Sequence, residues 1–382
     1  MSNKEIYYWS PFTNNVATIN AVINSAYSFQ EFSKGKYKTS IINALGEWDN
    51  YTNVIKNKRI NLINLNNTDF LSNKNYNGYF VSRIIYLIIF LRSLNPLKKI
   101  IIMNKPEFLI IHLITSLPLF LFSIFNFKTK LILRISGLPK MNYLRKIFWK
   151  FALKNVYKIT CPTNATREDL IKLNICENNK IFVLYDPIIV LREMKIKKKV
   201  KIDNKYNCNF IVSIGRLTKQ KNHIFLIKCF KKILKLNSEL KLFIIGSGEE
   251  KNNLLKKINE LKLNDNVYLL GYIDNIYPIL AKSKCFILPS LWEDPGFVIV
   301  EAASMNVPII SSNCKNGPNE ILGNGMGGYL FETNAEEDFI KKFYEFYNDT
   351  IESHYQKKLI AKKNIRNFSL FRHYLNFKRL LN

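Results

Sequence analysis

The sequence predicts an α/β protein built from two Rossmann-like domains, each with a parallel sheet. Three observations predict this class. The chain has 382 residues, which suits two domains of comparable size better than a single core. Apolar strand-like segments alternate with helical segments along most of the chain, as they do in βαβ units. Glycine, proline or polar residues follow the strands, and open α/β sheets bind ligands at those ends.

The first half begins with a short strand, "IYYWS", which is followed by an amphipathic helix over 15–32. The 20 uncharged residues at 108–127 are long enough to cross a bilayer. We interpret them instead as a buried strand, "FLIIHL", and a helix that begins near Pro118. A membrane span would separate the first hundred residues from the sheet that they should join. "KLILRISG" predicts the next strand.

The second half has the clearer pattern. Its helix at 222–236 places apolar residues on one face and lysines on the other. Strands are predicted at 208–214, 241–245, 266–270, 285–289 and 307–312.

Domain limits follow from these patterns. We expect an N-terminal domain over 1–188, a basic linker over 189–206 and a C-terminal domain over 207–348. Helices over 349–382 are expected to pack back toward the N-terminal domain.

Composition limits the partners. A formal net charge of +28 favours anionic partners, which include nucleotides, nucleic acid and acidic lipid. The six cysteines form no Cys-x-x-Cys pair and there are four histidines, so neither a zinc site nor a disulfide framework is indicated. We expect no metal and no organic cofactor. The N-terminus has no apolar signal region, so we expect a cytoplasmic protein.

Two cations follow the first strand of the second half, in "GRLTKQKN". Gly215 allows a tight turn, and Arg216 and Lys221 lie beside the start of a helix, where backbone amides favour anions. This pattern predicts a diphosphate site. Two solvated basic residues in a basic protein are the alternative.

Two carboxylates lie eight positions apart in "LWEDPGFVIVEA". Glu293 precedes a predicted helix and Glu301 lies about a turn and a half inside it, so the two are not a facing pair of the hydrolase type. They can instead hold opposite ends of one long ligand, with Glu293 near a sugar and Glu301 on the hydroxyls of a ribose. The alternative for Glu301 is an exposed helical side chain.

Backbone groups complete the predicted site. Gly246 in "GSGEE" lets the main chain approach a ligand, although a Gly-x-Gly alone is a weak signal. The amides of Gly296, Phe297 and Val298 begin the helix that carries Glu301, and they can face a phosphate.

These motifs, in this order, resemble the retaining glycosyltransferases of family 4, the glycosyl transferases of group 1, which have the GT-B fold. "GPNEIL" and "GGYLF" are similar to the closing segment of that family, and the resemblance is strong over 208–332. It implies that two Rossmann-like domains face each other across a cleft. It also implies that Arg216 and Lys221 bind the donor diphosphate, Glu293 contacts the transferred sugar and Glu301 binds the ribose. Such enzymes need no metal, since fixed cations and helix dipoles neutralise the leaving nucleotide.

The sequence departs from the family pattern on the acceptor side. The family commonly has a glycine-rich loop after the first strand, whereas this chain has "SPFTNN", so Thr13, Asn14 and Asn15 are expected to supply side-chain contacts. Ser136 stands where the family often has a histidine. His112 ends the preceding strand and is a candidate catalytic residue, and a satisfied core histidine is the alternative.

The resemblance implies a hexosyltransferase that moves a sugar from a UDP- or GDP-sugar to a lipid-linked or envelope glycan acceptor, such as lipopolysaccharide. The donor configuration would be retained by a front-face displacement in which the leaving diphosphate helps to deprotonate the acceptor. The N-terminal domain would bind the acceptor and the C-terminal domain the nucleotide sugar. One alternative is an epimerase of the same fold, which the scattered histidines do not favour. Another is a nucleic-acid-binding protein, but no recognised binding module appears and specific nucleic-acid binding is not expected.

A basic segment at 128–158 bears nine Lys and Arg residues and no acid. Its centre is helical in pattern, with a basic face beside an aromatic-rich one, as an interfacial helix requires. We therefore expect a peripheral protein at the inner face of the cytoplasmic membrane that contacts anionic lipid. The alternative is that the apolar face covers the N-terminal sheet. The apolar residues are Leu144, Ile147, Phe148 and Phe151, and the lysines are Lys146, Lys150 and Lys154.

Overall fold

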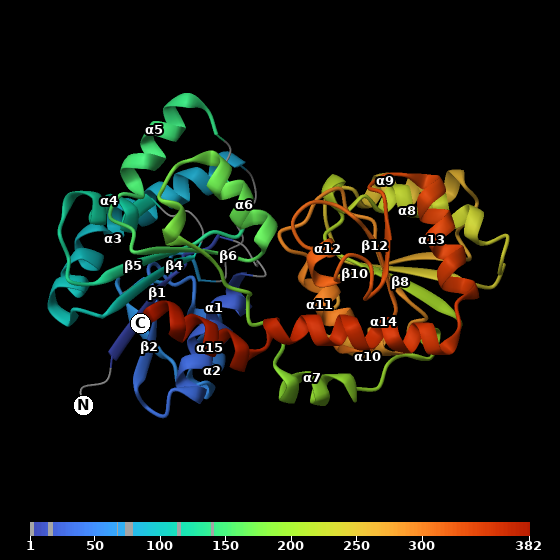
Figure 1. Cartoon of the computed structure of the whole chain (residues 1–382), viewed down its shortest axis with the longest axis horizontal. Coiled ribbons are helices and arrows are strands. Elements are labelled where there is room, and N and C mark those ends of the chain that lie inside the picture. The colour runs from blue at the N-terminus through green and yellow to red at the C-terminus, as the bar shows by residue number, and fades with distance from the viewer. Residues whose placement is uncertain (1–3, 14–17, 67, 73–78, 113–115, 139–140) are drawn as a thin grey trace. The chain divides into compact units, whose positions relative to one another are not determined.

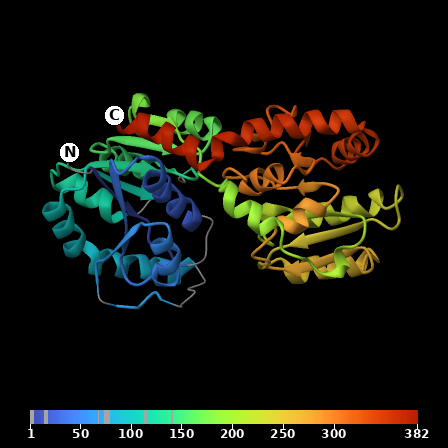
Figure 2. The same cartoon turned by 90° about the horizontal axis from the view of Figure 1, so that it is seen from below.

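The computed structural model describes residues 4–13, 18–66, 68–72, 79–112, 116–138 and 141–382 (Figure 1). The chain divides into two compact units. Unit 1 consists of Met1–Pro187 and Leu370–Asn382, and unit 2 consists of Ile188–Ser369. Each unit contains one parallel sheet with helices on both faces, which confirms the predicted fold class (Figures 1 and 2).

Unit 1 is built on a seven-stranded sheet in the order β3-β2-β1-β4-β5-β6-β7, and every strand pair is parallel. The strands are β1 (Lys4–Trp9), β2 (Tyr37–Asn43), β3 (Asn61–Asn64), β4 (Phe108–His112), β5 (Lys130–Arg134), β6 (Lys158–Cys161) and β7 (Ile181–Val183). The helices are α1 (Thr18–Phe32), α2 (Thr52–Asn57), α3 (Tyr79–Asn104), α4 (Ser116–Ile124), α5 (Tyr143–Ala152), α6 (Asn164–Leu173) and α15 (Leu370–Leu381).

The uncharged stretch at 108–127 forms a strand and a helix, as predicted. All five residues of β4 are buried, because this strand lies between β1 and β5 and is covered on both faces. α4 follows and packs Leu117, Leu119 and Leu121 into the core. Across the described residues, no helix combines the length and the hydropathy needed to cross a bilayer.

Two apolar clusters lie on opposite faces of this sheet. On one face, Tyr7 and Trp9 of β1 pack with residues of α3, α4, α5 and α6. On the other face, Ile6 and Tyr8 pack with α1, α2 and α15. Successive side chains of β1 therefore point to opposite faces of the sheet and pack against the two helical layers in turn.

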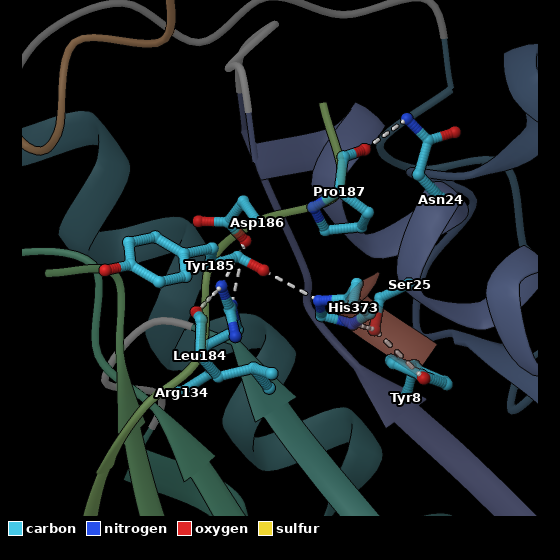
Figure 3. A network of polar contacts seen from close by, with 9 residues as sticks. All are labelled: Tyr8, Asn24, Ser25, Arg134, Leu184, Tyr185, Asp186, Pro187 and His373. Atoms are coloured by element: carbon cyan, nitrogen blue, oxygen red, sulfur yellow. Dashed lines mark hydrogen bonds and ion pairs between the residues drawn. The ribbon is translucent and has the colours of Figure 1, made fainter. Parts of the chain in front are cut away.

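The C-terminal helix α15 is tied into unit 1 by a buried polar network (Figure 3). His373 Nε2 lies 2.8 Å from Ser25 Oγ of α1, and His373 Nδ1 lies 2.7 Å from the carbonyl oxygen of Tyr185. Arg134 donates from Nε to Asp186 Oδ1 at 2.9 Å. These contacts satisfy polar groups that would otherwise be costly to bury.

Unit 2 is built on a six-stranded parallel sheet in the order β10-β9-β8-β11-β12-β13. The strands are β8 (Phe210–Ile214), β9 (Lys241–Ile245), β10 (Val267–Gly271), β11 (Phe286–Leu288), β12 (Ile309–Ser312) and β13 (Tyr329–Phe331). The helices are α7 (Leu191–Lys198), α8 (His223–Ile233), α9 (Lys251–Glu260), α10 (Tyr277–Lys282), α11 (Phe297–Ser304), α12 (Pro318–Ile321), α13 (Glu336–Asn348) and α14 (Ile351–Asn364).

Each sheet has a point where the strand order reverses, and ligands of open α/β sheets bind at such points. In unit 2 the chain passes from β8 outward to β9 and β10, and returns to place β11 on the other side of β8. The loops that follow β8 and β11 therefore leave the sheet side by side. In unit 1 the corresponding point lies between β1 and β4.

Candidate functional site

A buried ion pair joins the two loops at the reversal point of unit 2. Lys221 Nζ lies 2.5 Å from Glu293 Oε1, and the side chains are 13% and 4% exposed. Lys221 comes from the loop after β8 and Glu293 from the loop after β11. Two of the residues predicted for the donor site are thus in direct contact, although they are 72 positions apart in the chain.

Glu293 has a second partner that fixes its orientation. Ser290 donates its hydroxyl to the same carboxylate oxygen at 2.6 Å. The carbonyl of Ser290 in turn accepts from Ser312 Oγ at 2.6 Å, and the amide of Glu293 donates to the carbonyl of Lys315 at 3.2 Å. A carboxylate with these contacts is preorganised, because its position is set by groups on β12 and on the loops around it.

Further hydrogen bonds hold the two loops together. The amide of Leu291 donates to the carbonyl of Gln220 at 2.8 Å, and Gln220 Nε2 donates to the carbonyl of Trp292 at 2.9 Å. Arg216 is exposed, and its Nη2 lies 3.4 Å from Gln220 Oε1. The guanidinium therefore remains accessible to an anionic ligand, and Lys221 lies deeper, against Glu293.

Glycine is required at Gly246 because two loops touch there. Gly246 has φ +147°, and a Cβ at this position would lie 1.9 Å from the carbonyl oxygen of Gly215. Gly215 itself lies against the Lys221 side chain, and a Cβ on Gly215 would come within 3.1 Å of Lys221 Cδ. Glycine at Gly246 therefore allows its loop to approach the backbone of Gly215, and glycine at Gly215 leaves room for the Lys221 side chain.

The N-terminus of α11 supplies backbone donors. The helix starts at Phe297 after Gly296, which has φ +86°. The first amides of a helix have no intrahelical acceptor, so those of Phe297 and Val298 remain able to bind an anion. A Cβ on Gly296 would lie 3.3 Å from Glu293 Cγ, so this glycine also gives Glu293 its space.

Glu301 lies on α11, inside the helix, as predicted. Its Oε1 accepts a hydrogen bond from Tyr277 of α10 at 3.4 Å. Burial raises the pKa of Glu301 to about 7, and the contact with Tyr277 and the charge of Lys197 oppose that rise. The Glu301 carboxyl therefore changes between its protonated and ionised forms near pH 7. A ligand that donates hydrogen bonds to it would favour the ionised form.

The acceptor-side predictions fall in unit 1. Thr13 follows β1 and is buried, and His112 ends β4, so both lie at the reversal point of that sheet. Ser136 is half-buried in the loop after β5. Asn14 and Asn15 lie outside the described residues.

His112 is 1% exposed, and neither of its ring nitrogens has a hydrogen-bond partner among the described residues. Burial, together with the positive charge of Arg134 and the nearby His373, lowers the pKa of His112 well below its usual value near 6.5. The ring is therefore neutral at physiological pH and a weak base.

Several contacts were missed by reasoning from the sequence. Ser290 and Gln220 support Glu293 and its loop, and the quoted motifs contain both without indicating their partners. Tyr277 and Lys197 act on Glu301 from α10 and α7. Lys197 belongs to the segment interpreted as a linker, which forms a helix here. The effect of Lys197 on Glu301 depends on the tertiary structure of unit 2, and no local sequence pattern predicts it.

Comparison with known proteins shows that part of the chain matches a known family. Residues 194–364 match the family model described as "Glycosyl transferases group 1". An uncharacterized glycosyltransferase of Methanocaldococcus jannaschii is 36% identical over 251 residues, covering 59% of this chain and 60% of that relative. The alignment thus spans less than two thirds of that relative's length.

Two further matches extend over more of the chain. N-acetylgalactosamine-N,N'-diacetylbacillosaminyl-diphospho-undecaprenol 4-alpha-N-acetylgalactosaminyltransferase of Campylobacter jejuni is 26% identical, covering 72% of this chain and 77% of that relative. The crystal structure of Anabaena HepE in complex with UDP and glucose has a TM-score of 0.73 at 14% identity, covering 99% of both chains. At that identity the similarity shows the fold alone. Residues 194–364 of this chain therefore match the glycosyl transferases of group 1, and the chain has the GT-B fold.

Proposed function

We propose that the protein is a retaining glycosyltransferase that moves a sugar from a nucleotide-diphosphate sugar to a lipid-linked or envelope glycan acceptor, without a metal ion. One observation carries the proposal. Lys221, Glu293 and the start of α11 lie together at the carboxyl ends of the strands of unit 2, and Glu301 lies further along α11. A cation, helix amides and two separated carboxylates match the successive parts of a nucleotide sugar.

In this proposal the donor diphosphate lies against Arg216, Lys221 and the amides of α11. These groups supply fixed positive charge where the leaving diphosphate develops negative charge, and such electrostatic stabilisation often accounts for most of an enzyme's rate enhancement. Glu293 contacts the transferred sugar and Glu301 accepts hydrogen bonds from the ribose hydroxyls. Lys221 pairs with Glu293 in the described structure, so it would be shared between that carboxylate and the diphosphate.

The bond changes follow from the acceptor's chemistry. The acceptor hydroxyl oxygen forms a bond to the anomeric carbon of the sugar while the bond from that carbon to the diphosphate oxygen breaks. The hydroxyl proton passes to the leaving diphosphate. His112 remains a candidate from the sequence, but its low basicity makes the diphosphate the better proton acceptor in this scheme.

The relatives support a UDP-sugar donor and a lipid-linked acceptor. The Anabaena structure contains UDP, and the name of the Campylobacter relative specifies a diphospho-undecaprenol acceptor. The family match does not favour the epimerase or the nucleic-acid alternatives. On the acceptor side we propose Thr13, Asn14, Asn15 and Ser136 of unit 1, and a location at the inner face of the cytoplasmic membrane.

A transfer assay with a UDP-sugar panel and short diphospho-polyprenol acceptors tests the proposal. Proton NMR of the product reads the anomeric configuration directly. We expect the configuration of the donor to be kept. Net inversion, or conversion of the nucleotide sugar without transfer, would contradict the proposal.

A further inference from the structure

The outer face of the helices α3 and α5 in unit 1 is apolar where a water-exposed helix is ordinarily polar. Ile84, Leu87 and Leu91 follow one another along one side of α3 and are 60%, 57% and 64% exposed. Leu144 and Ile147 of α5 are 75% and 52% exposed. We call the set Ile84, Leu87, Leu91, Leu144, Ile147 and Phe151 the outer apolar surface.

α5 presents its apolar face outward. Trp149 and Ala152 are the buried residues of this helix and pack on the core, whereas Leu144, Ile147 and Phe151 point away from it. The sequence left open whether this face covers the sheet. In the structure it does not, because the opposite side of the helix fills that role.

The helices that carry this surface belong to one layer. α3 contacts α4, and α4 contacts α5, on the same face of the sheet. Phe90 of α3 and the exposed Phe120 of α4 join two of them, with ring centroids 5.4 Å apart. Figure 1 shows the three helices together in unit 1. Exposed apolar side chains that gather on one layer of helices are typical of an interaction site.

Charge identifies the partner. Between residues 70 and 167 the sequence has sixteen Lys and Arg residues and one acid, Glu107. Lys150 and Lys154 are exposed beside the apolar face of α5. A second copy of this chain would bring like charges together, and nucleic acid gains little from exposed aliphatic side chains. Aliphatic and aromatic residues bordered by lysines match an anionic lipid surface.

We propose that the outer apolar surface docks on an anionic bilayer, with its apolar side chains in the headgroup and acyl boundary and the adjoining Lys150 and Lys154 on lipid phosphates. The proposal deepens the proposed function and rests on it in one respect: a lipid-linked acceptor would be presented by the same membrane. Docking itself requires neither donor nor acceptor.

Vesicle co-sedimentation of the full chain tests the proposal, with phosphatidylcholine alone and with added phosphatidylglycerol. We expect recovery with the anionic vesicles at low salt and loss at high salt. The variants Leu144→Ser/Ile147→Ser and Lys150→Glu/Lys154→Glu should each lower the partition coefficient by about tenfold or more. Thermal unfolding of each variant checks that the fold is kept.

Matched controls carry equal changes outside this surface. Ile196→Ser/Ile351→Ser replaces two apolar residues of unit 2 that are 65% and 88% exposed, and Lys228→Glu/Lys231→Glu reverses two exposed lysines of α8. Both controls should bind as the wild type does, apart from a general charge effect smaller than that of the α5 variant.

Three results would overturn the inference. The first is equal recovery with neutral and anionic vesicles. The second is unchanged binding of the Leu144→Ser/Ile147→Ser variant, which would show adsorption by charge without insertion. The third is a combination of two results: the wild type does not bind vesicles, and it binds oligonucleotides in a salt-sensitive way that Lys150→Glu/Lys154→Glu abolishes. Thermal stabilisation by nucleotide sugars is measured without vesicles, so the donor site is judged separately.

Discussion

Lys221 Nζ and Glu293 Oε1 form an ion pair of 2.5 Å at the reversal point of the unit 2 sheet. The pair is nearly closed off from solvent, and Ser290 holds the same carboxylate oxygen. Breaking such a pair by removing one partner leaves an uncompensated charge, which is costly where water is excluded. The charge of Lys221 is therefore already paired in this structure, and a donor diphosphate bound as proposed would share Lys221 with Glu293.

Glu293→Ala should lower turnover by about 100-fold while donor affinity changes little, because the proposed contact is with the reacting sugar. Ser290→Ala removes only the orienting hydrogen bond, and we expect a smaller loss of about five- to tenfold. Steady-state kinetics with varied donor measure both effects. A Glu293→Ala enzyme with normal kcat and a raised KM would assign Glu293 to ground-state binding instead.

Donor affinity should depend on pH through Glu301. Burial raises the pKa of this carboxyl to about 7, and ribose hydroxyls donate to the ionised form, so protonation competes with binding. Affinity is then nearly full at pH 8, falls to about half near pH 7 and is about tenfold lower at pH 6 than at pH 8.

Calorimetric titration with an intact nucleotide sugar measures this dependence. A free nucleoside diphosphate is unsuitable, because its terminal phosphate titrates in the same range. Glu301→Gln should bind more weakly and with no pH dependence between these values. A pH profile shared by wild type and variant would place the titrating group elsewhere.

Chelation should leave transfer intact, because Arg216, Lys221 and the α11 amides already supply positive charge at the proposed diphosphate position. Arg216→Ala should cost on the order of 2 to 4 kcal/mol of transition-state stabilisation, as loss of other preorganised electrostatic groups does. Initial rates with and without EDTA decide the first point. Complete loss of activity in EDTA with recovery on addition of magnesium or manganese would overturn metal independence.

Much of the fold was predictable from the sequence because its signals are local. Parallel strands appear as short apolar runs, and the helix α8 buries Leu226, Ile227, Phe230 and Ile233 as its periodicity predicts. The side of α5 that faces the core was not predictable. Helical spacing shows which residues share a face, but the partner of that face depends on contacts far away in the sequence.

The same distinction applies to the site. Lys221, Glu293 and Glu301 were found because each lies in a short motif beside a glycine or a helix start. Tyr277 contacts Glu301 from α10 and the charge of Lys197 acts on it from α7, and nothing in their local sequence points to that carboxylate. Their effects on its pKa come from tertiary contacts and burial.

Gly246→Ala should destabilise unit 2 by about 3 kcal/mol or more, because the added Cβ would overlap the carbonyl oxygen of Gly215 at 1.9 Å. Gly271→Ala is the matched control. That residue also has a positive φ, +74°, but a Cβ there meets nothing within 4 Å, so the cost should be about 1 kcal/mol from backbone strain. Urea unfolding compares the two variants. Equal losses would show that backbone conformation, and not the close approach of the two loops, requires glycine at Gly246.

The most direct test of the account is calorimetric binding of UDP-, GDP-, ADP- and CMP-sugars to the wild type and to Glu301→Ala, with Glu337→Ala of α13 as an exposed control. We predict that the wild type and the control bind one nucleotide class with equal affinity, and that Glu301→Ala binds it about 10- to 100-fold more weakly through loss of charge-assisted hydrogen bonds. Failure of the wild type to bind any nucleotide sugar, or equal affinity of Glu301→Ala, would contradict the assignment of this site to the donor.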